Sequence, residues 1–325
     1  MMRTLLRSAA VLVAAVGLAG AAAAQSYPAR PITLVVGFSP GGSTDALARM
    51  VSEELSKSLG QSIIIENRPG AAGFVAYKHV AGAAPDGYTL LFSENALPIG
   101  TALNTDRNFD PIKSFAPVAM IARAPTVLLV NKDVPASNLA EVIALSKAKP
   151  GSLSFASSGI GSVSHMTFEA FRAAAGIDAV HVPYKGGGDA LAALASGTVQ
   201  LNLTSPHISK QMVDTGKAKA VVTTAAERLP VMPDVPTMAE AGVKSDVQLG
   251  FWFGVFGPAG LPADVVATWN KALAEVLAKP EMKEKLAKSN IAVAYADDKA
   301  LGALLESEIK NWTAFIDKAN LRTQQ

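Results

Sequence analysis

Three glycine-rich turns each follow an apolar stretch and precede a helical pattern. The turns occupy residues 37–45, 157–165 and 184–190. Glycine lets the backbone approach a ligand closely, and the unpaired N–H groups at a helix start, together with the helix dipole, favour an anion. In open α/β sheets, ligands bind beyond the carboxyl ends of strands, where such turns lie. The sequence therefore predicts that these turns bind an anionic group.

Hydroxyl side chains in the turns can add hydrogen-bond donors. Ser43, Thr44, Ser158 and Ser162 are of this kind, although Ser43 and Ser162 are equally suited to cap the following helices. No arginine lies within the three turns, and Arg49 is the nearest. Recognition of a carboxylate would therefore depend on N–H dipoles, hydroxyl groups and water instead of a bidentate arginine.

Enzymatic interpretations of the same turns fail on their details. Residues 37–41 match the G-x-S-x-G nucleophile motif, which would make Ser39 the nucleophile of a hydrolase. That motif needs the backbone N–H of the next residue, and Pro40 has none. Lys185 precedes the glycines of the third turn, whereas a phosphate-binding Walker A loop has its lysine after them. We expect no catalytic residue, with a Ser39 hydrolase as an alternative.

The composition also argues against metal or thiol chemistry. The chain has no cysteine, which excludes disulfide scaffolds, thiolate metal sites and a lipid-modified cysteine anchor. Gly159 and Gly161 lack the third glycine of a dinucleotide-binding fingerprint. The four histidines have no close metal-ligand spacing; they are His79, His165, His181 and His207. We therefore expect neither a metal nor another cofactor, and a hydrogen bond at a helix start as the role of His165.

The elements around these turns alternate between strands and helices. This alternation predicts an α/β protein with parallel strands. Proline and glycine are concentrated in residues 228–262, and two further helices are expected after them, at 262–279 and 299–318. Apolar β-branched runs predict strands at 32–38, 62–67, 88–93, 126–132, 153–158, 179–184, 199–204 and 218–224, and alanine-rich patterns predict helices at 44–59, 74–83, 138–148, 164–175 and 189–197.

Residues 1–24 have the pattern of a secretory signal peptide. Arg3 and Arg7 precede an apolar run at residues 9–20, and three alanines end the segment. The run is shorter than the ~20 residues that span a bilayer. Cleavage after Ala24 would remove two arginines and no acid, so the formal charge of +2 would become zero. We expect an exported, periplasmic protein whose neutral surface offers no case for nucleic acid or an anionic membrane as partner.

Several separated motifs resemble the Bug-type solute receptors, the periplasmic substrate-binding components of tripartite tricarboxylate transporters. The similarity extends from about residue 27 to residue 321, with the motifs in the family's order. The motifs are PITLVVGFSPGGSTD at 31–45, NRPGAAG at 67–73, APDGYTL at 84–90, SSGIGS at 157–162 with His165, VPYKG at 182–186 and PDVPTMAEAG at 233–242.

The resemblance implies a type II periplasmic binding protein, in which two α/β lobes close over a ligand cleft. Lobe one would comprise residues 25–124 and 226–325, and lobe two residues 125–225. A ligand carboxylate would be held by turns from both lobes. Carried onto this chain, the ligand-binding residues are Phe38, Ser39, Gly41, Gly42, Ser43, Thr44, Asp45, Ser157, Ser158, Gly159, Gly161, Ser162 and His165, with Tyr184, Lys185 and Gly186 as further contributors.

Some residues near these turns are candidates for determining specificity. Glu94 is either an ordinary surface residue or an acid near the cleft mouth, where it would disfavour a second anionic group and accept an amine or a hydroxyl. Asn95 follows it, and Asn202, Ser205 and His207 lie in or near the loop after a lobe-two strand. Lys185 would either add a positive charge to the cleft or point into solvent. The family's small residue and proline after the P-Y-K-G turn are replaced here by Gly187-Gly188-Asp189.

The function implied by the resemblance is that of a monomeric receptor for a small carboxylated solute: a dicarboxylate, an amino acid or an aromatic acid. Its partners would be the large and small membrane subunits of the transporter. A receptor that signals to a membrane sensor kinase would use the same closed surface, so the sequence leaves this alternative open.

Overall fold

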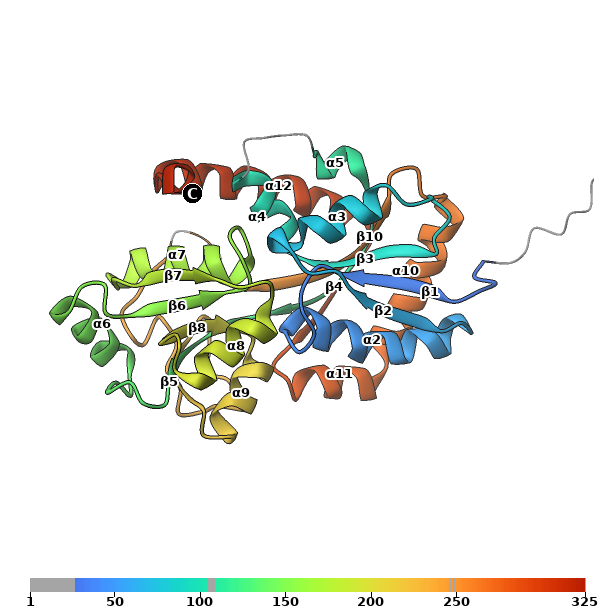
Figure 1. Cartoon of the computed structure of the whole chain (residues 1–325). Coiled ribbons are helices and arrows are strands. Elements are labelled where there is room, and N and C mark those ends of the chain that lie inside the picture. The colour runs from blue at the N-terminus through green and yellow to red at the C-terminus, as the bar shows by residue number, and fades with distance from the viewer. Residues whose placement is uncertain (1–26, 104–108, 246, 248, 325) are drawn as a thin grey trace, which may run out of the picture.

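The computed structural model describes residues 27–103, 109–245, 247 and 249–324, which form two α/β lobes (Figure 1). The predicted signal peptide lies outside the described residues. Lobe one contains a six-stranded sheet and lobe two a five-stranded sheet. This arrangement confirms the predicted fold class.

The six-stranded sheet of lobe one is mixed, with the strand order β11-β4-β10-β3-β1-β2. Strand β1 pairs in parallel with β2 and β3, and β10 runs antiparallel between β3 and β4. The strands are β1 (Ile32–Val36), β2 (Ile63–Asn67), β3 (Thr89–Glu94), β4 (Phe115–Ala124), β10 (Phe251–Pro258) and β11 (Ala292–Ala296); the helices are α2 (Ser43–Leu59), α3 (Phe74–Ala81), α4 (Ala96–Leu103), α5 (Pro111–Ser114), α10 (Ala263–Ala278), α11 (Pro280–Ala287) and α12 (Asp298–Lys318), with 3-10 turns η1 (Ala71–Gly73) and η2 (Leu321–Gln324).

The sheet of lobe two has the order β7-β6-β8-β5-β9. Strand β6 pairs in parallel with β7 and β8, whereas β5 runs antiparallel to β8 and β9. The strands are β5 (Val127–Asn131), β6 (Ser154–Ser157), β7 (Val180–Pro183), β8 (Leu201–Thr204) and β9 (Ala218–Thr223); the helices are α6 (Leu139–Ala148), α7 (Val163–Ala175), α8 (Gly187–Ser196) and α9 (Pro206–Asp214).

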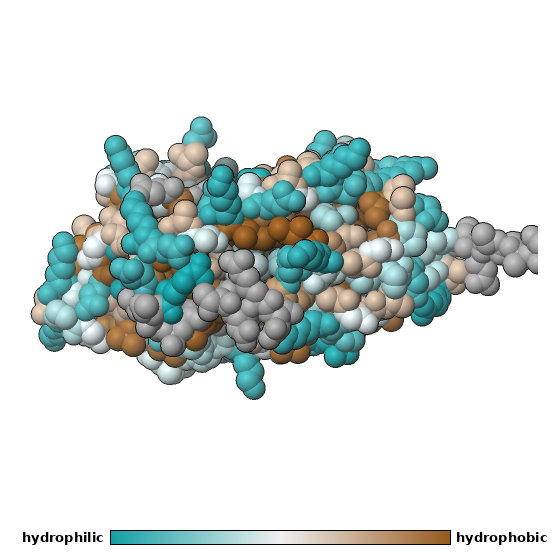
Figure 2. Space-filling model, turned by 90° about the horizontal axis from the view of Figure 1, so that it is seen from above, coloured by the Kyte–Doolittle hydropathy of each residue, from teal (hydrophilic) through white to brown (hydrophobic). Residues whose placement is uncertain are grey.

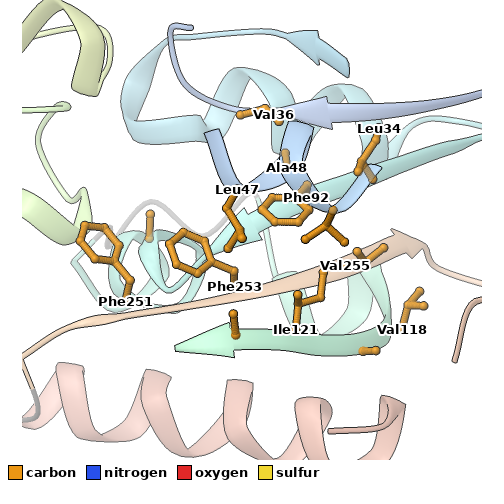
Figure 3. Packing of buried hydrophobic residues seen from close by; sticks show 14 of the residues in the cluster. Leu34, Val36, Leu47, Ala48, Phe92, Val118, Ile121, Phe251, Phe253 and Val255 are labelled. Carbon is orange, nitrogen blue, oxygen red and sulfur yellow. The ribbon is translucent and has the colours of Figure 1, made fainter. Parts of the chain in front are cut away.

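Successive residues of a strand point to opposite faces of the sheet, and in these strands both sets are apolar. Each sheet is therefore covered by helices on both faces. In lobe one, Leu34 and Val36 of β1 pack in the same cluster as side chains of α2 and α10, and Val35 packs with α3 and α12. Figure 3 shows the first cluster, with Phe92 of β3 and Phe253 of β10 side by side between sheet and helix. In lobe two, α6 and α7 share one cluster and α8 and α9 another.

Two segments cross between the lobes. The first connects β4 to β5, and the second returns from β9 to β10. They are hydrogen-bonded to each other, because the N–H of Thr126 donates to the Thr224 hydroxyl (2.8 Å) and the N–H of Thr224 donates to the Thr126 carbonyl (2.9 Å). After this point the chain stays with lobe two, since Met232 packs with α8 and α9, and Met238 with α6 and α7. The predicted boundary at 225/226 stays a prediction, and these contacts lead us to propose that lobe two extends to about residue 249.

Helix α12 lies over both lobes. It begins on lobe one, where Leu301 and Leu305 pack, and its second half brings Trp312 and Ile316 into a cluster that includes Val163 of α7. Figure 2 shows this side of the molecule, with hydrophilic side chains over most of the face and apolar ones near its middle. Within the described residues, no helix combines the length and apolar composition that crossing a membrane requires.

The core packing predicts a contrast between two aliphatic residues on neighbouring strands. Leu34 of β1 is 1% exposed, whereas Ile64 of β2 is 53% exposed. Replacing Leu34 by Ala should lower the free energy of unfolding by about 2–5 kcal/mol, because it leaves a cavity in the core. Ile64→Ala should cost no more than about 1 kcal/mol. Urea unfolding followed by circular dichroism tests this, and equal losses in the two variants would contradict the packing described here.

Candidate functional site

The carboxyl ends of the parallel strands in the two lobes face one another, so six strand–helix turns meet between the lobes (Figure 1). Four of these turns begin helices α2, α7, α8 and α9. The side chain of Ser162 caps α7, because its hydroxyl accepts a hydrogen bond from the N–H of His165 (3.2 Å). Among the described residues the other three helices have no side-chain cap, so N–H groups of their first turns are available to a ligand. In α9 these are the N–H groups after Pro206, because the proline at its first position has none.

Of the two predicted helix caps, Ser162 is confirmed and Ser43 is wrong. The N-cap position of α2 is Gly42, and Ser43 is the first residue of the helix. The Ser43 hydroxyl instead donates across the lobe boundary to the Ser205 hydroxyl (2.7 Å) and lies 3.3 Å from that of Thr204. This side chain therefore connects the N-termini of α2 and α9.

A small cavity between the lobes, which we call the inner cavity, has a volume of ≈ 20 Å³. It receives side chains from the turns of both lobes, so the fold brings together seven of the residues selected from the sequence. Those seven are Phe38, Gly42, Ser43, Thr44, Glu94, Ser158 and Asn202; the rest of the lining is Ser164, Gly187, Ala190, Leu203, Thr204 and Phe251.

A second, wider depression between the lobes, the outer groove, has a volume of ≈ 1040 Å³. Four of the residues selected from the sequence line it: Gly159, Gly161, Tyr184 and Lys185. Their role in ligand binding stays a prediction. Lys185 is exposed here. The opposite wall comes from η1, α3 and α4; its residues are Ala71, Ala72, Phe74, Lys78, Gly100 and Leu103, and Ile160, Pro183 and Asp189 complete the lining.

Between the inner cavity and the outer groove the two lobes touch through their backbones. A Cβ on Gly188 would lie 2.3 Å from the carbonyl oxygen of Pro40, and one on Gly186 would lie 2.4 Å from the backbone nitrogen of Ser39. The Ser39 hydroxyl donates to Asp189 Oδ2 (2.9 Å). Within the described residues this is the hydroxyl's one hydrogen-bond partner, so no imidazole base activates it as a hydrolase would require.

Asp45 was selected as a ligand contact, but its carboxylate is occupied by donors from the protein itself. Its carboxylate accepts hydrogen bonds from the N–H of Gly41 (3.1 Å), the Arg49 guanidinium (3.0 Å) and the Asn67 amide (3.0 Å). Burial opposes ionisation of the carboxyl, but these three donors outweigh it and lower the pKa of Asp45. The ionised side chain holds the turn that contains Gly41, and Arg49 neutralises it outside the cavity.

His165 and His181 stack on each other, with ring centroids 4.0 Å apart, and Phe155 stacks on His181. His165 Nδ1 accepts from the N–H of Gly161 (3.1 Å), and His181 Nε2 lies 2.6 Å from the Ser157 hydroxyl. The predicted helix-start hydrogen bond of His165 is thereby confirmed. Burial lowers the pKa of His165 to about 3 and that of His181 to about 4, with neighbouring positive charge adding to the effect. Both rings are therefore neutral supports of the turn at 157–162.

Glu94 is buried, with 3% of its surface exposed, so its interpretation as a surface residue is wrong. It ends strand β3, and its carboxyl accepts a hydrogen bond from the Thr44 hydroxyl. Burial raises the pKa of Glu94 to about 7, and the hydrogen bond from Thr44 opposes this only in part. An acid with this pKa inside a cleft is a candidate for ligand contact.

The remaining selected residues occupy other positions. Asn95 donates to the carbonyl of Gly250 (3.0 Å) and so holds the return segment into β10. His207 lies near Ser289 of lobe one, at 3.2 Å. The structure adds Ala72, Ser164 and Asp189, which we did not select. Ala72 has a positive φ of 52°, and the sequence signal for this strained loop was the NRPGAAG motif.

Within the described part of the chain, no three His, Cys, Asp or Glu side chains gather in a way that could hold a metal ion. The inner cavity instead offers hydroxyl groups, backbone N–H groups and one buried carboxyl, and the outer groove adds Lys78, Lys185 and Asp189. The N–H and hydroxyl groups suit an acceptor on a small organic molecule, and the carboxyl suits a hydrogen-bond donor or a cation.

Comparison with known proteins agrees with this geometry. The model of the tripartite tricarboxylate transporter family receptors, TctC, matches residues 47–321. Protein BugT of Bordetella pertussis is 32% identical over 317 residues, which cover 97% of each chain. Among solved structures, MatC of Rhodopseudomonas palustris with bound malate is 36% identical, with a TM-score of 0.82 over 89% of this chain and 99% of that one. The R. palustris protein Rpa4515 with adipate is 33% identical, with a TM-score of 0.86 over 90% and 98%.

The fold and the turns therefore define a periplasmic solute-binding protein, which is not an enzyme. The chain belongs to the TctC family of tripartite tricarboxylate transporter receptors, also called Bug proteins, as its motifs indicated.

The stacked histidines predict how stability depends on pH. A histidine whose folded pKa lies below the unfolded value of ~6.5 stabilises the protein above that pH, and this contribution is lost as the pH falls towards the folded pKa. Between pH 7 and pH 4.5, His181→Gln should therefore lose less stability than the wild type, by about 1 kcal/mol or more. Urea unfolding at the two pH values measures this. His79→Gln, outside the stack, should behave as the wild type; equal losses in wild type and His181→Gln would show that His181 is protonated in the folded protein.

Proposed function

We propose that this protein binds a small carboxylated solute between its lobes and passes it to the large and small membrane subunits of a tripartite tricarboxylate transporter. The observation that carries the proposal is the meeting of three uncapped helix N-termini from both lobes, those of α2, α8 and α9. Orphan N–H groups and helix dipoles are attractive to a carboxylate without any arginine. The ligands of the relatives, malate and adipate, are carboxylates too.

Closure of the lobes is the second part of the proposal. A ligand that contacts turns of both lobes favours the closed form over the open one. The inner cavity of ≈ 20 Å³ has room for one group about the size of a water molecule, so one end of the ligand occupies it and the rest of the ligand lies outside it between the lobes. A molecule held in this way has to enter while the lobes are apart. The closed surface is what the membrane subunits would recognise. Periplasmic location follows from the family, and we propose that the export signal at residues 1–24 is cleaved after Ala24.

Calorimetric titration of purified, refolded protein with dicarboxylates, amino acids and aromatic acids tests the proposal. Unfolding beforehand removes ligand carried through purification. We expect at least one carboxylate to bind, with an affinity that weakens when Ser158, which lines the inner cavity, is replaced by Ala. If no carboxylate binds, the proposal is wrong.

The contact between Gly188 and Pro40 provides a sharper prediction about closure. An alanine at position 188 suits helix α8, but its Cβ would meet the Pro40 carbonyl oxygen at 2.3 Å only when the lobes are closed. Gly188→Ala should therefore weaken ligand affinity at least about tenfold, which corresponds to ~1.4 kcal/mol, and leave the melting temperature of the ligand-free protein unchanged or raised. Gly302→Ala in α12, where a Cβ meets ordinary contact at 3.5 Å, is the matched control. Unchanged affinity in Gly188→Ala would contradict closure at this contact.

A further inference from the structure

The inner cavity contains a buried acid without a positively charged partner. Glu94 reaches the cavity from the end of β3 and has Thr44 as its one hydrogen-bond partner within the described residues. None of the residues that line the cavity is Lys, Arg or His. A buried carboxylate is costly unless a cation or several donors compensate it. Without such compensation the carboxyl is relieved by protonation, whereas a positively charged ligand group in the cavity would stabilise its ionised form.

Asn202 of the opposite lobe also lines this cavity. The Asn202 amide nitrogen on β8 donates to the carbonyl of Ala156 (3.0 Å), and this bond determines which way the amide points, because the carbonyl needs a donor. The other end of the amide, Oδ1, is buried and has no hydrogen-bond partner among the described residues. Leaving such an acceptor unpaired costs about 1–3 kcal/mol, so it also calls for a donor.

The hydroxyl groups around the cavity are already engaged with one another. Ser158 and Ser164 lie 3.1 Å apart, and Ser43 donates to Ser205. A group that fills the cavity must therefore bring several donors of its own and be about as small as a water molecule, given the ≈ 20 Å³ available. A primary ammonium group has three donors, a positive charge and this size. A hydroxyl has one donor and no charge, and a second carboxylate would repel Glu94.

We propose that the inner cavity is an amine subsite, in which Glu94 of lobe one and Asn202 of lobe two together bind the ammonium group of an amino carboxylate. The inference rests on the proposed function, since the ligand's carboxylate is assigned to the helix N-termini beside the cavity. An ammonium that contacts both residues bridges the two lobes and adds to the stability of the closed form. It also favours the ionised form of Glu94, whose pKa burial otherwise raises to about 7.

Three sets of ligands test this subsite, and the members of each set differ only in the group on the α-carbon, which is an amine, a hydroxyl or hydrogen. The sets are aspartate, malate and succinate; alanine, lactate and propionate; and phenylalanine, phenyllactate and phenylpropionate. Calorimetric titration at pH 7.5 should give, within the set that binds, an affinity for the amine at least about tenfold above that for the hydroxy acid and the unsubstituted acid, a difference of ~1.4 kcal/mol per tenfold.

Two variants separate the subsite from general carboxylate binding. Glu94→Gln should weaken amine binding at least about tenfold and reduce the preference for the amine over the unsubstituted acid, which has no group for the subsite. Glu306→Gln, an exposed acid of α12, is the matched control and should bind as the wild type. Asn202→Leu, which keeps the size but removes the acceptor, should also lower the preference for the amine. Thermal melting checks that each variant is folded.

The outcomes distinguish the two proposals. If succinate, propionate or phenylpropionate binds as tightly as its amine, or if Glu94→Gln leaves amine binding unchanged, the amine subsite is wrong while carboxylate binding stands. If none of the nine compounds binds, and the wider screen also gives no carboxylate, both proposals are wrong.

Discussion

The closed arrangement depends on backbone meeting backbone where the two lobes touch. The glycines at 186–188 face residues 39–42, and a single Cβ on Gly186 or Gly188 would lie within 2.4 Å of the opposite main chain. Close approach without side chains brings the N-termini of α2 and α8 together. It also leaves no space there for an arginine or lysine side chain. In the proposed function, these fixed N–H dipoles bind the carboxylate and need little rearrangement when the ligand arrives.

The charged residues of the site are arranged around this constraint. Asp45 lies on α2 next to the cavity, yet its carboxylate is neutralised by Arg49 and by the N–H of Gly41, so it stabilises the turn instead of repelling a ligand. The neutral pair His165 and His181 supports the opposite turn by stacking. Glu94 is the exception, because it is buried and none of the described residues that line its cavity is a cation. The two lobes thus offer dipoles to one part of a ligand and a carboxyl to another.

Much of the fold could be predicted from the sequence, since all eight expected strands and all seven expected helices are present. Helices α4, α5 and α9 were not expected. The strands that were missed are β4, β10 and β11, at 115–124, 251–258 and 292–296. Strands β4 and β10 contain Pro117 and Gly254 within apolar stretches, and they pair antiparallel with partners far away in the chain. No local pattern indicates such a pairing. Helix α11 was missed because Pro280 was taken to end a helix, whereas it begins the next one.

The sequence by itself determined the family, the α/β alternation and the positions of the glycine-rich turns, because glycines, apolar periodicity and helix starts are local properties of the chain. It left open whether Glu94 lies on the surface or in the cleft, and whether Ser43 caps a helix or contacts the ligand. Only the tertiary structure decided these, because the burial of Glu94 and the bond from Ser43 to Ser205 depend on residues 50 to 162 positions away. Burial and pairing across lobes are properties of the closed assembly, which no stretch of neighbouring residues contains.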